Sequence, residues 1–227
     1  REGDVFIREV SHGLEVASWE YLDTGDIQSQ EISLDFLSLR SSAGDFGRVD
    51  FKVQKEGLLP GEQPLERIGI TIPSGEHLSQ RWGGFIRSAS FRRFRVQLRV
   101  DDGGYFNGDR LNIRPELEWR PNEHLAFSLE YGYSKFEFPG NQQATTRQIT
   151  FENEISFNAK MSLVTLAQYD NVSEDIGVNS RFRYNLSAGQ DTWFVINHNM
   201  HRDVHLDNRF QSMESIAAAK IRYTFRY

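Results

Sequence analysis

The sequence is dominated by a two-residue alternation of apolar and polar side chains. From Phe94 to Asp101, apolar residues stand at every even position and polar or charged residues at every odd position. The stretches from Leu111 to Trp119 and from Ile221 to Tyr227 show the same period. A period of two is typical of a β-strand with one apolar face and one polar face. Helical spacing is sustained nowhere, so the chain predicts an all-β fold.

About twelve segments fit this pattern, and most are nine to fourteen residues long. Strands of soluble proteins usually have about 5–6 residues. A tilted strand that crosses a bilayer needs about 9–11. Residues 1–13 fit either a periplasmic segment or a truncated strand. The expected strands are 14–22, 28–40, 47–58, 78–88, 91–101, 109–119, 124–137, 145–157, 161–170, 177–187, 191–200 and 215–227.

The connections between these segments alternate in length. Short ones are expected at 41–46, 89–90, 120–123, 158–160 and 188–190, and longer ones at 59–77, 102–108, 138–144, 171–176 and 201–214. Short turns at one rim and long loops at the other indicate an up-and-down meander. We therefore expect 1–227 to form a single domain, an antiparallel up-and-down transmembrane β-barrel. About twelve strands lie in this sequence, and because it begins with Arg1 we expect it to belong to a longer chain.

Composition excludes several classes of protein. The 227 residues include no Cys, which excludes disulfide scaffolds, Cys-ligated metal sites and thiol catalysis. A formal net charge of -6 argues against a dedicated nucleic-acid binder. The longest run without Asp, Glu, Lys or Arg is the ten residues from Thr192 to His201, too short for a membrane-spanning helix. No cofactor is expected.

A membrane barrel reconciles the 38% hydrophobic content with a spanning structure. In lipid every backbone polar group must be paired within the protein, so a spanning sheet must close, with its apolar face outward. Aromatic residues expected near strand ends would lie at headgroup level: Trp82, Trp119, Trp193, Tyr131, Tyr133, Tyr169, Tyr184, Tyr223 and Tyr227. A soluble β-sandwich, or a soluble β-barrel that binds an apolar ligand, would show the same alternation.

The polar sides of the strands carry many charges of both signs. Cross-strand pairs of opposite charge stabilise a sheet face by about 0.2–1 kcal/mol each. These residues therefore fit either an ion-pair ladder that strengthens the wall or a selective pore. The expected lumen-facing ladder is Arg95, Arg99, Arg114, Glu116, Glu118, Glu130, Glu152, Glu154, Arg181, Arg183, Lys220 and Arg222.

The middle and end of the chain resemble a known protein family. The motifs that carry the resemblance are Tyr105–Leu111, Leu117–Pro121, His124–Leu125, Leu129–Tyr133, Leu166–Val172, Asn179–Tyr184 and Asp191–Val195. Their order and spacing resemble the C-terminal barrel of a family of Gram-negative outer-membrane proteins. Full-length members join an N-terminal carbohydrate-binding-like domain of the family-nine type to this C-terminal domain of unknown function. The resemblance covers residues 78–227 well and the first 77 loosely.

The resemblance implies a bacterial outer-membrane location, with lipid and lipopolysaccharide as surroundings. The final residues Ile221, Tyr223, Phe225 and Tyr227 resemble the signal by which the barrel-assembly machinery recognises its clients. The family's N-terminal sugar-binding-like domain is absent from this sequence, so no glycan-binding activity comes with the resemblance. A protein partner in the periplasm or membrane is also expected.

One group of residues has metal-binding character. His198, His201 and His205, with Asp203 and Asp207 nearby, offer imidazole and carboxylate ligands. They fall across a strand end and a loop, so a solvated loop is the better interpretation, and no metal is assigned.

The function expected from these features is non-enzymatic: a channel, a transport component, or a membrane anchor for a partner or for the missing domain. The alternative is a membrane-embedded hydrolase with its site at the extracellular loops. Glu116 and Glu118 share a strand face, an arrangement that resembles the carboxylate pair of a glycosidase. Nearby Arg114 favours the ionised form of both carboxyl groups, which does not suit a general acid.

Overall fold

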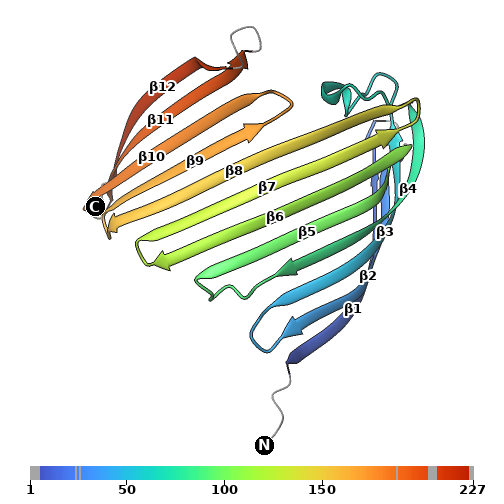
Figure 1. The fold of residues 1–227 in the computed structure, drawn as a ribbon, viewed down its shortest axis with the longest axis horizontal. Coiled ribbons are helices and arrows are strands. Elements are labelled where there is room, and N and C mark those ends of the chain that lie inside the picture. Colours follow the sequence, from blue (N-terminus) through green and yellow to red (C-terminus); the bar gives the residue numbers. More distant parts are fainter. Residues whose placement is uncertain (1–5, 24, 26, 188, 204–208, 225–227) are drawn as a thin grey trace, which may run out of the picture. The chain divides into compact units, whose positions relative to one another are not determined.

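The computed structural model describes residues 6–23, 25, 27–187, 189–203 and 209–224. Twelve strands pair in chain order as an antiparallel meander, as the alternation predicted (Figure 1). In the described ranges the only helical element is a short 3₁₀ helix, η1 (Glu66–Ile68). No helix in the described ranges is long and apolar enough to cross a membrane. The strands are β1 (Ile7–Glu20), β2 (Ile27–Ser41), β3 (Phe46–Leu58), β4 (Gly75–Arg87), β5 (Phe94–Tyr105), β6 (Gly108–Asn122), β7 (Leu125–Phe138), β8 (Gln142–Asn158), β9 (Met161–Asp170), β10 (Asp175–Ser187), β11 (Gln190–Asp203) and β12 (Arg209–Tyr223).

The strand number was predicted correctly, but several boundaries were wrong. β1 begins at Ile7, so half of the segment left open at 1–13 belongs to a strand. β5 extends to Tyr105 and β6 begins at Gly108, so the expected long connection at 102–108 is a two-residue turn. Asp102, Gly103 and Gly104 were expected in this connection, yet they belong to β5, and Asp102 and Gly103 pair with β4. Between described strands, only the segment from Leu59 to Ser74 makes a long loop.

The chain groups into two compact units, which we describe separately. Unit 1 comprises Arg1–Pro115 and Gly132–Thr146, and unit 2 comprises Glu116–Tyr131 and Arg147–Tyr227. Strands β6, β7 and β8 contribute residues to both units.

In unit 1 the strand register fixes two chemically distinct faces. On the apolar face Leu14, Leu34, Phe51 and Trp82 lie opposite one another across β1 to β4. The rings of Phe51 and Trp82 are 4.9 Å apart between centroids. The polar face carries the residues between them, such as Asp50 and Lys52 of β3. A bulge between Asp35 and Leu37 leaves Phe36 exposed while Asp35 stays on the polar face.

Unit 2 has the same two faces. On its apolar face Ile155, Leu163, Phe182 and Phe194 lie side by side across β8 to β11. Stacked rings of Trp119, Phe127 and Phe151 continue this face through β6 and β7. The alternate residues make up the polar face, which includes Glu154 and Arg181. On β9, Leu163 lies on the apolar face and Val164 on the polar face.

Burial is inverted relative to a soluble protein. Among the described residues 33 large hydrophobic side chains are exposed, whereas only eight hydrophobic residues are buried. Several of the buried residues are polar, and they include Asp50, Asn112 and Asp191. A soluble protein rarely leaves such an extensive apolar surface exposed, and large apolar patches mark membrane or protein contacts.

The one described hydrophobic core cluster lies in unit 1, beneath the long loop. Ile70 and Ile72 of the loop are 1% and 0% exposed and pack with Phe106, Phe136 and Phe138. The Thr71 N–H donates to Oε1 of Gln142 at 2.7 Å, which holds the loop to the start of β8. Figure 1 shows this loop and η1 beside the β7–β8 hairpin. We call residues 59–74 the packed loop.

Candidate functional site

The polar face of unit 1 is organised in cross-strand rows of like charge. Asp35, Asp50, Gly83 and Asp101 lie opposite one another on β2 to β5 and form an acidic row. Asn112 of β6 extends it, because its side-chain amide donates to Asp101 at 3.3 Å. This row lies between two rows of basic residues.

The two basic rows follow from the same register. On one side, Arg48, Phe85 and Arg99 lie opposite one another, two residues along from the acidic row. On the other side lie Lys52, Arg81 and Gly103. The contact between Asn112 and Asp101 adds Arg114 to the first basic row and Arg110 to the second, because side chains alternate along β6.

The acidic row is buried most deeply at Asp50. Asp50 is 3% exposed, and its carboxylate lies 3.3 Å from Nε of Arg48. Arg48 also lies 3.6 Å from Asp35. Gly83 makes this burial possible, because a Cβ there would overlap the carboxylate of Asp50. Asp50 therefore neutralises Arg48 while leaving little negative charge on the face.

Basic residues nearer the packed loop are partly paired. Lys52 contacts Glu31 at 3.0 Å, and Arg81 lies 3.9 Å from Glu31. Arg81 also donates to Oε1 of Gln54 at 2.5 Å. Next to this group a cavity of about 700 Å³ opens under the packed loop. Its lining includes Trp19, Glu31, Glu56, Gln63 and Phe106.

In the described part of unit 2 one carboxylate of the polar face is buried, that of Asp191 near the start of β11. Asp191 is 2% exposed and accepts hydrogen bonds through Oδ1 from Arg183 and Asn185, each at 2.8 Å. Nη2 of Arg222 donates to Oδ2 at 2.5 Å. This carboxylate therefore joins β10, β11 and β12. The ring of Trp193 lies beside it, 5.3 Å from the guanidinium of Arg222.

The predicted ladder residues lie on the polar faces, but the register does not place every one of them opposite a residue of opposite charge. Arg181 lies opposite Val164 and Val195, and Glu154 also lies opposite Val164. The opposite-sign pairing within the predicted set was therefore wrong for these two, because register rather than charge pattern decides which residues meet. Arg183 and Arg222 pair with Asp191, which was not predicted as a ladder residue. The remaining members Arg95, Arg99, Arg114, Glu116, Glu118, Glu130, Glu152 and Lys220 lie on polar-face positions of β5 to β8 and β12.

Three aromatic residues depart from the expected belt, and one of them, Tyr131, lies near the middle of β7. Trp193 lies on the polar face, opposite Arg183 and Lys220. Trp82 is on the apolar face but near the middle of β4, not at its end. Sequence position alone could not distinguish these placements, because a strand contributes side chains to both faces.

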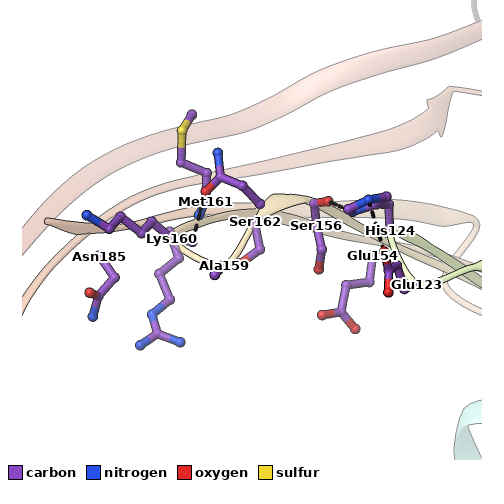
Figure 2. Close-up of a pocket in the computed structure, with 11 residues that line it drawn as sticks. Glu123, His124, Glu154, Ser156, Ala159, Lys160, Met161, Ser162 and Asn185 are labelled. Atoms are coloured by element: carbon purple, nitrogen blue, oxygen red, sulfur yellow. Dashed lines mark hydrogen bonds and ion pairs between the residues drawn. The ribbon is translucent and has the colours of Figure 1, made fainter. Parts of the chain in front are cut away.

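A second cavity of about 410 Å³ lies in unit 2, at the β6–β7 and β8–β9 turns. Figure 2 shows Glu154, Ser156 and Asn185 pointing to one side of the strands, whereas Met161 points to the other. The ring of His124 contacts the backbone oxygen of Ser156 at 2.8 Å and not its hydroxyl. The cavity thus brings a glutamate, a serine and a histidine together without a serine–histidine hydrogen bond.

The histidines considered as metal ligands do not converge. His198 contacts the hydroxyl of Ser215 at 2.6 Å, and His201 contacts Asp175 at 2.7 Å. Their positions on β11 place them on opposite faces of the sheet. His205 lies outside the described residues. Among the residues that the structure does describe, no group of three His, Cys, Asp or Glu side chains could hold a metal ion.

The predicted assembly signal is described in part. Ile221 is 77% exposed, and Tyr223 is exposed on the same face of β12. Phe225 and Tyr227 lie outside the described residues.

Sequence reasoning missed the residues that organise both polar faces. Asp50 and Gly83 are far apart in the sequence. They meet only because the register of β3 and β4 pairs them. Asp191 precedes the continuous apolar run Trp193–Ile196 and carries no local signal for burial. A glycine on the polar face of an otherwise bulky strand, as at Gly83, was the one available hint of a close approach.

Comparisons with known proteins add little to this geometry. No family model matches the chain, and no curated protein matches it. Among solved structures the chain is similar to one described as "KdgM porin in complex with disordered oligogalacturonate". The identity is 9% and the TM-score 0.34, with 96% of this chain and 100% of that chain covered. Similarity at this level transfers no function, and the family resemblance seen in the sequence motifs stays a prediction.

Proposed function

We propose that this protein is a bacterial outer-membrane β-barrel that lets small polar solutes cross the membrane. In this proposal the twelve strands close into a barrel, the apolar faces contact lipid and the polar faces line a water-filled path. The observation that carries the proposal is the inverted burial, with 33 large hydrophobic side chains exposed among the described residues.

The energetics favour a lipid environment for these side chains. Moving one large apolar side chain out of water is worth about 1.5–3 kcal/mol. An exposed set of this size would strongly disfavour a soluble monomer. The chain's outer rows, such as Ile155, Leu163 and Phe182, offer lipid a continuous surface. A polar face rich in Arg, Asp and Glu suits contact with water.

The proposal also assigns partners and a role outside catalysis. The exposed Ile221 and Tyr223 on β12 fit recognition by the barrel-assembly machinery. Lipid and lipopolysaccharide would surround the apolar faces. The proposed role requires no cofactor and no catalytic group.

Two measurements test this function. Cell fractionation with heat-modifiable gel mobility should place the protein in the outer membrane and show faster migration before boiling. Recovery from the soluble fraction, with migration unaffected by boiling, would refute the barrel. In planar bilayers the folded protein should give discrete conductance steps, and no conductance from a heat-modifiable sample would refute the open path.

A further inference from the structure

Four arginines on the polar face of unit 1 have no acidic partner. Within the described residues, Arg87, Arg99, Arg110 and Arg114 make no ion pair with a carboxylate. Three of them, Arg87, Arg99 and Arg114, are exposed. We call these four residues the arginine track.

Aromatic rings support three of the four guanidinium groups. Cζ of Arg99 lies 5.3 Å from the ring centroid of Phe85, and that of Arg87 lies 5.5 Å from Phe46. Cζ of Arg110 lies 4.1 Å from the ring of Tyr105. Contact with a ring face holds a guanidinium in place and leaves its in-plane N–H groups free to donate.

The arginine track places like charges next to one another. Because Asn112 contacts Asp101 across a two-residue turn, antiparallel pairing places Arg114 opposite Arg99. Directly opposed like charges destabilise a sheet. A wall that needed only internal ion pairs would place a carboxylate at one of these two positions. A bound anion removes the repulsion between them.

The acids nearby do not neutralise the arginine track. Asp50 is buried over Gly83 and pairs with Arg48, and Asp101 accepts from Asn112. On the described polar face from β3 to Pro115 of β6, eight basic residues accompany three acidic ones. The basic residues are Arg48, Lys52, Arg81, Arg87, Arg95, Arg99, Arg110 and Arg114, and the acidic ones are Asp50, Glu56 and Asp101. On β2 of the same face, Glu31 and Asp35 pair with Lys52, Arg81 and Arg48. The basic residues in excess are therefore mainly those of the arginine track, although the whole chain has a net charge of -6.

The spacing of the arginine track suits a ligand with several charges. Successive rows on one face are about 7 Å apart, because side chains recur every two residues at about 3.3–3.4 Å per residue. Arg87 lies one row from Arg99 and Arg114, and Arg110 lies two rows beyond them. The arginine track therefore extends over about 20 Å along the strands.

We propose that the arginine track binds polyvalent oxyanions, organic or inorganic molecules that carry several carboxylate or phosphate groups. A planar guanidinium donates two parallel hydrogen bonds to either group, which a neutral or cationic solute cannot accept with the same charge assistance. The inference rests on the proposed function, since it names the class of solute that would follow the polar path.

The first experiment measures ion selectivity in planar bilayers across a KCl gradient. The wild type should prefer chloride to potassium. The double variant R99E/R114E should reverse that preference. A matched control, K135E/R147E, makes the same change in net charge on the apolar face near the loop ends of β7 and β8. It should keep the wild-type preference. Conductance without anion preference would overturn the inference and leave the proposed channel intact.

The second experiment measures binding by calorimetry, with heat-modifiable protein in detergent, and needs no conduction. Citrate and pyrophosphate are the probes, and maltotriose and spermidine are the neutral and cationic comparisons. Citrate or pyrophosphate should bind, with at least a tenfold loss in R99E/R114E and no change in K135E/R147E. The conservative R99K/R114K should show an intermediate loss, because lysine keeps the positive charge but cannot donate two parallel hydrogen bonds. Binding by citrate alone identifies carboxylates, and binding by pyrophosphate alone identifies phosphates.

The two experiments separate the two proposals. Oxyanion binding without conductance supports the arginine track and refutes the channel. Conductance with equal affinity for maltotriose and citrate refutes the arginine track alone. Retention of tight citrate binding in a folded R99E/R114E variant also refutes it.

Discussion

The polar faces of the two units use the same strand alternation but carry opposite charge. In unit 1 basic residues of the described polar face slightly outnumber the acidic ones. Asp50 is buried against Arg48, and Asp101 accepts a hydrogen bond from Asn112. In unit 2 carboxylates predominate among the described polar-face residues, with Glu116, Glu118, Glu130, Glu152, Glu154, Asp191 and Glu214 against a smaller basic set that includes Arg181, Arg183, Lys220 and Arg222. The net charge of -6 describes neither face.

The units also differ in how they use hydrophobic residues. Unit 1 buries a cluster beneath the packed loop, centred on Ile70 and Ile72. Unit 2 has no buried hydrophobic cluster among its described residues and relies on Asp191 to join three strands. The same alternation along the strands therefore determines which face of the sheet is apolar, but it does not determine how the polar face is stabilised.

The largest effect is expected from placing charge on the apolar face of either unit. Leu34→Arg in unit 1 and Ile196→Arg in unit 2 should each destabilise the membrane-embedded protein by about 2–4 kcal/mol, the cost of a basic residue at the bilayer midplane. Both side chains are exposed near the centres of their strands. Asn197→Arg, one residue along on the polar face, is the control and should cost far less. Urea unfolding in lipid vesicles measures the difference, and equal costs for positions 196 and 197 would contradict the assignment of faces.

The next largest effect is expected from a substitution in the packed loop of unit 1. Ile72→Ser removes a fully buried side chain, and loss of its packing should cost about 2–4 kcal/mol. We expect the loop to detach while the strands stay paired, which would make residues 59–74 sensitive to limited proteolysis. Conductance should rise because the loop would leave the polar face. Thr71→Ser, at the adjacent exposed residue, should leave both measurements unchanged. Resistance of Ile72→Ser to proteolysis would show that the loop does not depend on this contact.

The buried carboxylate of Asp191 in unit 2 should contribute more to stability than an exposed pair in the same unit. Asp191→Asn removes the charge that neutralises Arg183 and Arg222, so the apparent melting temperature in detergent should fall. Asp175→Asn removes an exposed contact with His201 and serves as the control, with little change expected. A similar melting temperature for both variants would mean that Asp191 is not the point that joins β10, β11 and β12.

The smallest effect concerns acid stability at a turn of unit 1. Asp45 lies outside the strands, and the N–H of Ala89, with the Arg92 guanidinium and the Ser41 hydroxyl, lowers its pKa from the ordinary value. A carboxyl group with a lowered folded pKa contributes stability above its unfolded pKa of about 3.9, and this contribution is lost as the pH falls through the folded value. Asp45→Asn should therefore flatten the decrease in melting temperature below about pH 4. An unchanged acid profile would show that Asp45 contributes no proton linkage.

Much of the fold could be predicted from the sequence because strand periodicity is local. The alternation from Phe94 to Asp101 assigned faces correctly without any knowledge of neighbouring strands. The ends of strands were harder, since Asp and Gly residues at 101–104 favour turns in isolation but pair normally here. Sequence position also failed for Trp193, which alternation alone did not exclude from the polar face.

The candidate site could be predicted only as a set of charged residues. Arg99 and Arg114 were recognised as polar-face residues, but their opposition depends on the β5–β6 turn. Asp50, Gly83 and Asp191 were missed, because burial of a carboxylate depends on what lies across the sheet.

The sequence by itself determined twelve amphipathic strands, their chain-order pairing and the apolar side of most of them, because a two-residue period and short turns are properties of neighbouring residues. The tertiary structure decided which charges meet, which are buried and which arginines have no acidic partner. These outcomes depend on cross-strand register, which brings together residues tens of positions apart and which no local pattern encodes.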